Sequence, residues 1–274
     1  MGIKYRLFMQ PIIFTDLDET LLDEKYSFKD AAPALRLIQN KKIPLIFCTS
    51  KTEPETKIYV KKMKLKQPFI VENGGAIFIP KGYFDFKFSY DKIKNNYFVI
   101  ELGTPYVTLK RLANKIKNEA KCNIVDFSQL NEKIIKKETG LRLEEAKLAK
   151  KRSYSFGFKI KKGYVGEVIK IIKKYKLSYT GGKLYHYIMG RNDKAKAVKI
   201  LTRLYKQKYK DIFTVGLGNN FNDLQMLKAV DKAFLIKNKG GYNKDLVKVK
   251  NIEKISLIAS KGWNKAILSW FKKC

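Results

Sequence analysis

The stretch PIIFTDLDETLL, residues 11–22, is an apolar run that ends abruptly in two carboxylates, Asp16 and Asp18. Such a run is typical of a strand buried in a sheet, and parallel sheets bind ligands beyond the carboxyl ends of their strands. In an extended backbone, residues i and i+2 point to the same side, so both carboxylates can face one pocket. The alternative is a polar strand exit or turn without chemical function.

Two carboxylates this close repel each other unless a cation lies between them or one of them is protonated. A hard divalent cation with oxygen ligands, Mg²⁺ above all, satisfies the first condition. Asp16 can then attack a phosphorus atom as a nucleophile, while a protonated Asp18 donates to the leaving oxygen and later deprotonates water. The pair therefore predicts phosphoryl chemistry with Mg²⁺ as cofactor.

The chain has 274 residues, 45% of them hydrophobic and 30% charged, which fits a globular protein of one large or two smaller domains. No apolar run reaches the roughly 18 residues that span a bilayer, and the first ten residues are too short for a secretory signal. Cys48, Cys122 and Cys274 are widely spaced, which suits a reducing compartment and argues against a zinc site or disulfide framework. We therefore expect a cytoplasmic protein.

The formal net charge of +33 attracts nucleic acid, anionic membranes or small acidic substrates. Lysine pairs such as Lys41 with Lys42 are scattered along segments with helical spacing, which is typical of solvated helix faces. An anionic small substrate is a partial explanation of the charge. No zinc-finger spacing, RNP signature or basic arm occurs in the sequence, so a nucleic-acid-binding protein is only a remote alternative.

Strand-like and helix-like segments alternate along the chain in the order of a βαβ protein. We expect core helices at residues 28–40, 53–64, 195–208 and 224–229, and core strands at 11–16, 43–48, 69–72, 212–215 and 233–236. Between them, aromatic strand candidates at 83–90, 97–102, 152–160 and 183–188 alternate with helix candidates at 109–120 and 143–151. This alternation of aromatic and polar residues is typical of an antiparallel sheet with one face exposed to solvent.

The predicted fold class is α/β, with a Rossmann-like parallel-sheet core and an inserted α+β domain. Residues 1–84 and 187–274 form the expected core, and residues 85–186 form the inserted domain. The sequence does not predict the oligomeric state.

Two further groups of residues fall where this topology places sites. Thr49 and Ser50 end the second strand and Lys51 follows, a combination that suits a phosphate oxygen. The alternative is that these hydroxyls cap the next helix, with Glu53 as capping-box partner. Lys194 lies near the start of a helix, where a cation is unfavourable, which indicates a compensating bound anion unless the lysine is solvated.

The segment VGLGNNFNDLQML, residues 215–227, places Asn219, Asn222 and Asp223 between a buried strand and a helix. Oxygen-bearing side chains in a turn that contains glycine suit a hard cation. The alternative is an ordinary N-capped turn.

Taken in order, DLDET at 16–20, a strand ending in Thr49, Lys194, and G-x-x-x-N-D at 218–223 resemble the four motifs of the haloacid dehalogenase (HAD) superfamily of phosphohydrolases. The resemblance spans nearly the whole chain. It implies that Asp16 becomes an aspartyl phosphate, that Asp18 acts as general acid and base, and that the inserted domain is a cap. The implied catalytic residues are Asp16, Asp18, Thr49 and Lys194, and the implied Mg²⁺ ligands are Asp16, Asp18, Asn219 and Asp223.

Six longer strings resemble the mannosyl-3-phosphoglycerate phosphatase branch of that superfamily. They are FTDLDETLLD (14–23), KYSFKDAAPAL (25–35), IPLIFCTSKTEPE (43–55), PFIVENGGAIFIP (68–80), GGKLYHYIMGRNDKAKAV (181–198) and KGWNKAI (261–267). Enzymes of this branch remove phosphate from mannosyl-3-phosphoglycerate to give mannosylglycerate, a compatible solute. The resemblance therefore implies a Mg²⁺-dependent phosphatase of a small anionic phosphorylated sugar. The implied substrate-binding residues are Ser50, Lys51, Glu72, Asn73, Gly74, Gly75, Arg152, His186 and Asn222.

Three departures from the family pattern keep alternatives open. Asn219 stands where the metal loop usually has aspartate, and Glu19 where a glycine usually follows the second aspartate. The segment RSYSFGF, residues 152–158, lacks the glutamates and proline expected after the corresponding arginine. The alternatives are a HAD phosphatase of another sugar phosphate and a catalytically impaired HAD-like binding protein. His186 has its own alternative, a packing histidine between aromatic residues.

Overall fold

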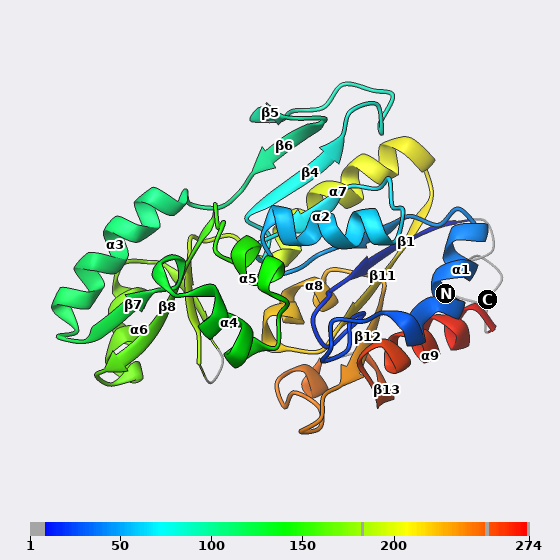
Figure 1. Cartoon of the computed structure of the whole chain (residues 1–274). Helices are drawn as coiled ribbons and strands as arrows, with labels where there is room; N and C mark the ends of the chain where they lie inside the picture. Colours follow the sequence, from blue (N-terminus) through cyan, green and yellow to red (C-terminus); the bar gives the residue numbers. More distant parts are fainter. Residues whose placement is uncertain (1–8, 182–183, 250–251, 273–274) are drawn as a thin grey trace.

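A five-stranded parallel sheet forms the centre of the molecule (Figure 1). The computed structural model describes residues 9–181, 184–249 and 252–272. The strand order is β13-β12-β11-β1-β2, and each neighbouring pair is parallel. The strands are β1 (Gln10–Thr15), β2 (Leu45–Phe47), β11 (Ile212–Gly218), β12 (Lys232–Lys237) and β13 (Ile252–Ile258). The predicted α/β class with a parallel sheet is confirmed.

Helices cover both faces of this sheet. One face packs against α1 (Ala32–Asn40), α2 (Glu53–Lys62) and α9 (Ala259–Lys272), and the other against α7 (Lys194–Tyr209) and α8 (Leu224–Lys228). Alternation along β1 explains the two cores, because Ile13 joins the first cluster whereas Ile12 and Phe14 join the second. Every one of these three side chains is fully buried, as expected for a strand covered on both faces.

Two antiparallel sheets adjoin the parallel one. The order β3-β4-β6-β5 combines β3 (Phe69–Val71), β4 (Ala76–Pro80), β5 (Lys92–Lys94) and β6 (Tyr97–Glu101). The order β7-β8-β10-β9 combines β7 (Asn123–Asp126), β8 (Ser155–Lys162), β9 (Ser178–Gly181) and β10 (His186–Met189). In Figure 1 this second sheet lies on the left, away from the parallel sheet.

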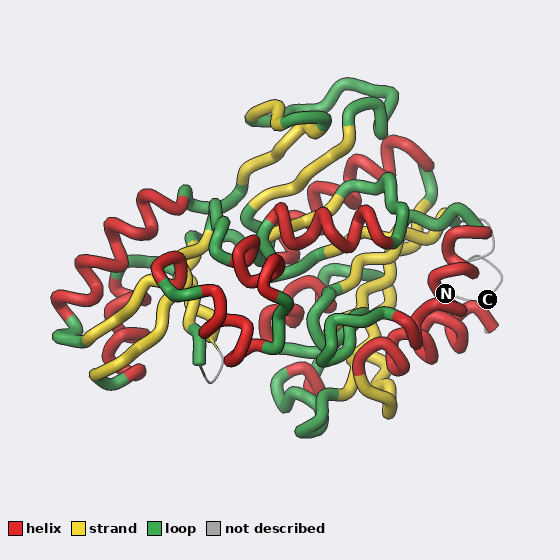
Figure 2. The backbone as a smooth tube through the Cα atoms, viewed as in Figure 1, coloured by secondary structure: helices red, strands yellow, loops and turns green. Residues whose placement is uncertain are grey.

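The second antiparallel sheet has its own core with α3 (Tyr106–Glu119) and α6 (Val165–Lys174). Two shorter helices, α4 (Glu132–Thr139) and α5 (Leu143–Ala149), lie between it and the parallel-sheet body (Figure 2). Short 3₁₀ turns complete the described elements: η2 (Lys29–Ala31), η3 (Phe127–Gln129), η4 (Phe221–Asp223) and η5 (Leu246–Lys248). The division into residues 1–84 with 187–274 and residues 85–186 stays a prediction, since β5 and β6 of the second range pair with β4 of the first.

One predicted strand is wrong. Residues 83–90 form no regular element, although their aromatic residues alternate. Phe84, Phe86 and Phe88 instead form one aromatic cluster, in which the Phe84 ring packs edge-on against Tyr205 of α7. Alternate aromatic residues in this segment are buried against a helix, which gives the same sequence pattern as a strand with one buried face.

Several helices end on a lysine in the left-handed region of the backbone, with φ between 47° and 61°. Glycine is the usual residue at such positions because it has no Cβ to clash. A cation near a helix C-terminus is nevertheless favoured by the helix dipole, which offsets part of the strain. The five lysines follow α1, α2, α3, α6 and α7; they are Lys42, Lys64, Lys121, Lys176 and Lys210.

Within the described part of the chain, no helix is both long enough and apolar enough to cross a membrane. Cys48 and Cys122 are free thiols. The expectations for the first eight residues and for Cys274 lie outside the described residues.

Candidate active site

Three buried charged side chains meet at the carboxyl ends of β1 and β11. Asp16 directly follows β1, Lys194 begins α7, and Asp223 lies in the turn after β11. The ammonium of Lys194 lies 2.6 Å from Asp16 Oδ1 and 2.6 Å from Asp223 Oδ1. Lys194 is 1% exposed, so its charge is neutralised by these two carboxylates. We call these three residues the buried triad.

Local sequence explains how the buried triad forms. Asp193 caps α7 by accepting a hydrogen bond from the Lys196 backbone N–H over 2.9 Å, which makes Lys194 the first helical residue. Gly218 allows the close approach of Asp223, because a Cβ on this glycine would lie 2.6 Å from the Asp223 Cβ. The cation at the start of α7 is therefore compensated by protein carboxylates, and Lys194 is not the solvated lysine of the alternative.

Burial and the nearby charge of Asp223 together raise the pKa of Asp16 to about 7, although Lys194 lowers it in part. Burial alone would lower the pKa of Lys194, but the two carboxylates hold it above its ordinary value. A perturbed carboxyl beside a fully buried cation is typical of functional sites.

A second ion pair lies beside the buried triad. Lys51 Nζ lies 2.9 Å from Asp18 Oδ1 and 4.8 Å from the centre of the Tyr26 ring. Lys51 is almost completely buried, whereas the side chain of Asp18 is 37% exposed. Burial alone would lower the pKa of Lys51, but Asp18 and Glu55 raise it well above its ordinary range. Asp18 thus stands at the open side of the site and Asp16 at its buried side.

The predicted hydroxyl residues Thr49 and Ser50 do not cap α2. Thr49 is fully buried, and its Oγ1 accepts a hydrogen bond from the Lys51 backbone N–H over 3.1 Å. The alternative in which Thr49 and Ser50 cap α2 with Glu53 is wrong. Thr52 is the N-cap, and it forms a capping box with Glu55.

The turn after β11 is organised by Asp223. Its Oδ2 accepts hydrogen bonds from the backbone N–H groups of Asn219 and Asn220 over 2.9 and 3.0 Å. Asn222 donates to Asn73 Oδ1 over 3.0 Å, which ties the turn to the loop after β3. Both carboxylate oxygens of Asp223 are therefore used by the protein, and this residue is fully buried.

The oxygen donors beside Asp16 fit a Mg²⁺ ion only if a neutral ligand takes part. Among the described residues, no three His, Cys, Asp or Glu side chains are grouped to hold a metal ion. Asp16, Asp18 and Asn219 nevertheless line one cavity of about 340 Å³. Two carboxylates and a side-chain amide oxygen are donors that Mg²⁺ accepts in proteins. These three residues fit the ion, while Asp223 lies behind them.

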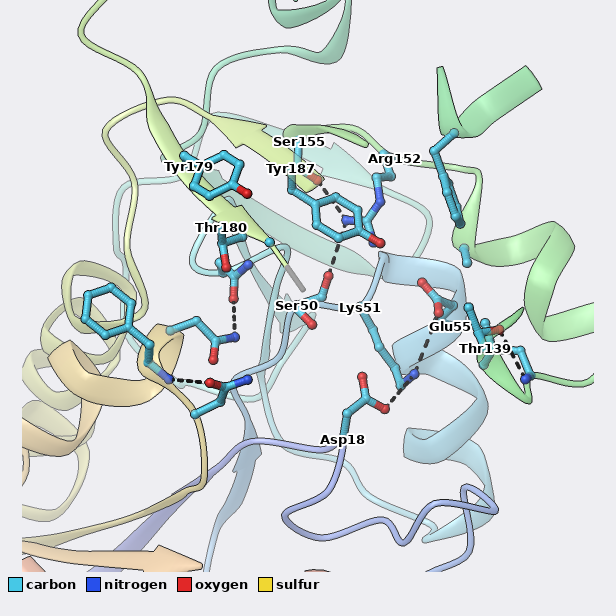
Figure 3. Close-up of a pocket in the computed structure, with 18 of the residues that line it drawn as sticks. Asp18, Ser50, Lys51, Glu55, Thr139, Arg152, Ser155, Tyr179, Thr180 and Tyr187 are labelled. Carbon is cyan, nitrogen blue, oxygen red and sulfur yellow. Dashed lines mark hydrogen bonds and ion pairs between the residues drawn. The ribbon is translucent and has the colours of Figure 1, made fainter. Parts of the chain in front are cut away.

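A larger cavity of about 570 Å³ opens between the parallel-sheet body and the sheet β7-β8-β10-β9 (Figure 3). Its wall on the parallel-sheet side includes Asp18, Tyr26, Ser50, Lys51, Glu55, Asn73, Asn220, Phe221 and Asn222. Its opposite wall includes Phe127, Thr139, Leu141, Ala149, Arg152, Ser155, Tyr179, Thr180, Gly181 and Tyr187. Predicted site residues thus come from both sides of one cavity.

Arg152 bridges the two walls. Its guanidinium donates to Ser155 Oγ over 2.8 Å and to the Ser50 carbonyl over 3.3 Å, and it lies 4.4 Å from the centre of the Tyr187 ring. Its Nε is buried and has no hydrogen-bond partner in the described structure. Arg152 and Lys51 therefore bring two cations to the cavity (Figure 3).

The predicted substrate residue Glu72 is fully engaged by the protein. Its carboxylate accepts hydrogen bonds from the backbone N–H groups of Ser153 and Tyr154 over 2.8 and 3.0 Å and from Ser155 Oγ over 2.5 Å. Glu72 thereby fastens the start of β8 to the end of β3. Of these four residues, Ser155 lines the cavity, whereas Glu72, Ser153 and Tyr154 do not.

Gly74 and Gly75 permit close packing instead of lining the cavity. Gly74 has φ +82°, and a Cβ on it would lie 2.1 Å from the Asp193 carbonyl oxygen. A Cβ on Gly75 would lie 2.5 Å from the Tyr154 Cβ. These contacts join the loop after β3 to the start of α7 and to the start of β8.

His186 lies behind the cavity wall. Its Nδ1 lies 2.6 Å from the Tyr179 hydroxyl, and its ring stacks on the Tyr179 ring at 5.8 Å between centroids. Burial lowers the pKa of His186. Tyr187, the next residue, lines the cavity in its place, because successive strand residues face opposite sides.

Sequence reasoning missed Tyr26, Tyr179, Thr180 and Tyr187 in the cavity wall. Tyr179, Thr180 and Tyr187 reach the cavity through the pairing of β10 with β8 and β9, whereas Tyr26 reaches it from the loop after β1. That pairing has no local signal in the sequence.

A family model described as haloacid dehalogenase-like hydrolase matches residues 13–249. A glucosyl-3-phosphoglycerate/mannosyl-3-phosphoglycerate phosphatase of Methanococcoides burtonii is 42% identical over 268 residues, which cover 97% of this chain and 98% of that protein. A phosphatase of the same name from Persephonella marina is 40% identical, over 93% of this chain and 95% of its own. A mannosyl-3-phosphoglycerate phosphatase of Pyrococcus furiosus is 36% identical, over 82% and 90%.

Solved structures with low sequence identity share the fold. The crystal structure of Thermoplasma acidophilum 0175 gives a TM-score of 0.68 at 17% identity, over 97% of this chain and 100% of that one. The sucrose-phosphatase of Synechocystis gives a TM-score of 0.61 at 10% identity, over 96% and 98%.

Proposed function

The chain belongs to the haloacid dehalogenase-like hydrolase family, and on that premise we propose that it is a phosphatase of a glycosyl-3-phosphoglycerate. The observation that carries the proposal is the buried triad, whose Asp16 lines a cavity that shares Asp18 and Ser50 with the larger cavity holding Lys51 and Arg152. A glycosyl-3-phosphoglycerate carries a phosphate and a carboxylate, so two cations beside the reaction centre suit it. The names of the similar phosphatases support glucosyl and mannosyl substrates.

In the proposed reaction, an Asp16 oxygen attacks phosphorus in line with the departing glyceryl oxygen. The phosphorus–oxygen bond to the glyceryl group breaks, and Asp18 gives its proton to that oxygen. Water then attacks the phosphorus of the aspartyl phosphate, and Asp18 takes a proton from the water. The bond between phosphorus and the Asp16 oxygen breaks, so inorganic phosphate leaves and the Asp16 carboxylate is restored. Lys194 stabilises the charge on the phosphate oxygens, and the Thr49 hydroxyl is proposed to hold one of them.

Mg²⁺ is the proposed cofactor, held by Asp16, Asp18 and Asn219 on the cavity wall. When bound, it would supply charge neutralisation between the phosphate and Asp16. Asp223 is proposed to act through Lys194 and the turn, because both of its oxygens already accept hydrogen bonds.

Residues 85–186 are proposed to act as a cap that selects the sugar. Tyr179 and Thr180 in the cavity wall belong to this range and Tyr187 directly follows it, which supports the assignment. Substrate entry would draw Lys51 from Asp18 toward the incoming anion, which frees Asp18 for proton transfer.

Release of inorganic phosphate from glucosyl- and mannosyl-3-phosphoglycerate and from a panel of simple sugar phosphates tests the proposal. With Mg²⁺, the wild-type protein and the exposed control variant Asp85→Asn should release phosphate, while Asp16→Asn should not. Activity of Asp16→Asn equal to wild type would show that the nucleophile is assigned wrongly. Binding of these ligands without any turnover by wild type would instead establish the catalytically impaired binding protein, and preference for a simple sugar phosphate would establish another substrate.

A further inference from the structure

Asn219 and Asn238 are joined by two hydrogen bonds beside the proposed Mg²⁺ site, one between their side chains and one to the Asn219 backbone. Asn219 Nδ2 donates to Asn238 Oδ1 over 2.7 Å, and Asn238 Nδ2 donates to the Asn219 backbone carbonyl over 3.1 Å. Asn219 is 3% exposed and lines the cavity that contains Asp16 and Asp18. The nitrogen end of the Asn219 amide is therefore committed to Asn238, which leaves its oxygen end for the cavity.

The backbone holds Asn238 in a fixed place. Asn238 directly follows β12, and its N–H and carbonyl both pair with Gly241 over 3.0 Å. Gly241 has φ +103°, a conformation that a side chain would strain. This short turn presents the Asn238 side chain to Asn219 from the neighbouring strand of the parallel sheet.

The chemistry of an amide makes its orientation matter. A carboxylate offers a cation two equivalent oxygens, whereas an amide offers one oxygen and one N–H₂ group that repels a cation. Rotation of the Asn219 amide by half a turn would exchange a ligand for a repulsive group. Partners that fix the orientation of a ligand typically change metal affinity by about 10- to 100-fold when removed.

We propose that Asn238 is a positioning residue that turns the Asn219 carbonyl oxygen toward Mg²⁺. The inference rests on the proposed function, because it assigns a ligand to the same site. Asp223, the one acidic side chain of this turn, already accepts hydrogen bonds from Lys194 and from the Asn219 N–H. The proposal explains how the turn can still hold a divalent cation through the neutral residue Asn219.

The test measures Mg²⁺ binding by titration calorimetry in the absence of substrate. Asn238→Ala should weaken Mg²⁺ binding about tenfold, since the amide of Asn219 can then rotate. Asn243→Ala is the matched control. The Asn243 side chain reaches the turn of Asn219 through a long 3.4 Å hydrogen bond to Asn220 and otherwise accepts from the Asp245 N–H, so its loss should leave the affinity unchanged. Urea midpoints in EDTA establish that each variant is folded.

A second background separates positioning from general support. Asn219→Asp supplies two equivalent oxygens, so Asn238→Ala should weaken Mg²⁺ binding at least threefold less in this background than in wild type. Equal losses in both backgrounds, or no loss in wild type, would overturn the positioning role. Failure of the unmutated protein to bind Mg²⁺ would overturn the metal assignment itself. Mg²⁺ binding without phosphate release would leave the positioning role standing and contradict only the proposed reaction.

Discussion

Replacement of Lys194 by methionine tests whether the buried triad stabilises the fold. The substitution removes an ammonium that lies 2.6 Å from a carboxylate oxygen on each side. Loss of one partner from a buried ion pair costs about 3–5 kcal/mol, because the remaining charge is uncompensated. Asp223 keeps its two backbone N–H donors, so Asp16 carries most of the loss. We therefore expect Lys194→Met to lower the free energy of unfolding by about 3 kcal/mol, at the lower end of that range.

The assay is urea unfolding at pH 7.5 in EDTA. Lys196→Met is the control, because the Lys196 side chain on the same helix is 55% exposed and should change the free energy of unfolding by less than about 0.5 kcal/mol. Addition of Mg²⁺ should stabilise Lys194→Met more than wild type, since a bound cation replaces part of the missing charge. A Lys194→Met protein as stable as wild type in EDTA would refute the reasoning.

Two further predictions concern positions outside the buried triad. Burial would raise the pKa of Glu53, but hydrogen bonds from Lys57 and Lys94 lower it below its ordinary value of 4.5. Ionised Glu53 therefore stabilises the fold at pH values above its unfolded pKa. This contribution is lost as the pH falls through the lower pKa of the folded state. Glu53→Gln should therefore flatten the fall of the urea midpoint between pH 5 and pH 3, and parallel curves would contradict this. Gly74→Ala should cost about 3 kcal/mol or more, from left-handed strain plus a clash with backbone, whereas Gly82→Ala, also at positive φ but with open space around it, should cost about 1 kcal/mol. Equal urea midpoints for these two variants would show that the close approach is unimportant.

Local patterns predicted the part of the site that lies on the parallel sheet. The apolar run before Asp16 shows a buried strand, and a parallel sheet brings its strand ends to one edge. Lys194 was predicted from its place at a helix start, although its partners turned out to be protein carboxylates. These inferences needed only periodicity and the order of elements.

Long-range packing decided the rest. The family resemblance implied His186 as a substrate residue, but Tyr187 lines the cavity instead, and alternation alone does not tell which face of β10 meets it. Glu72 was predicted to contact substrate, but backbone donors 81 and 82 residues further along the chain engage its carboxylate. The segment 83–90 imitates a strand because its rings pack on a helix that begins more than a hundred residues later.

The five lysines in left-handed conformation after helices offer a way to change the net charge of the protein without changing the residues of the cavity. Each occupies a position where asparagine is well tolerated, and none of them lines the cavity. Exchange of all five for asparagine would lower the net charge by five while relieving unfavourable backbone geometry. A protein altered in this way would reveal whether the excess of positive charge accelerates capture of an anionic molecule from solution or merely reflects which amino acids this polypeptide favours.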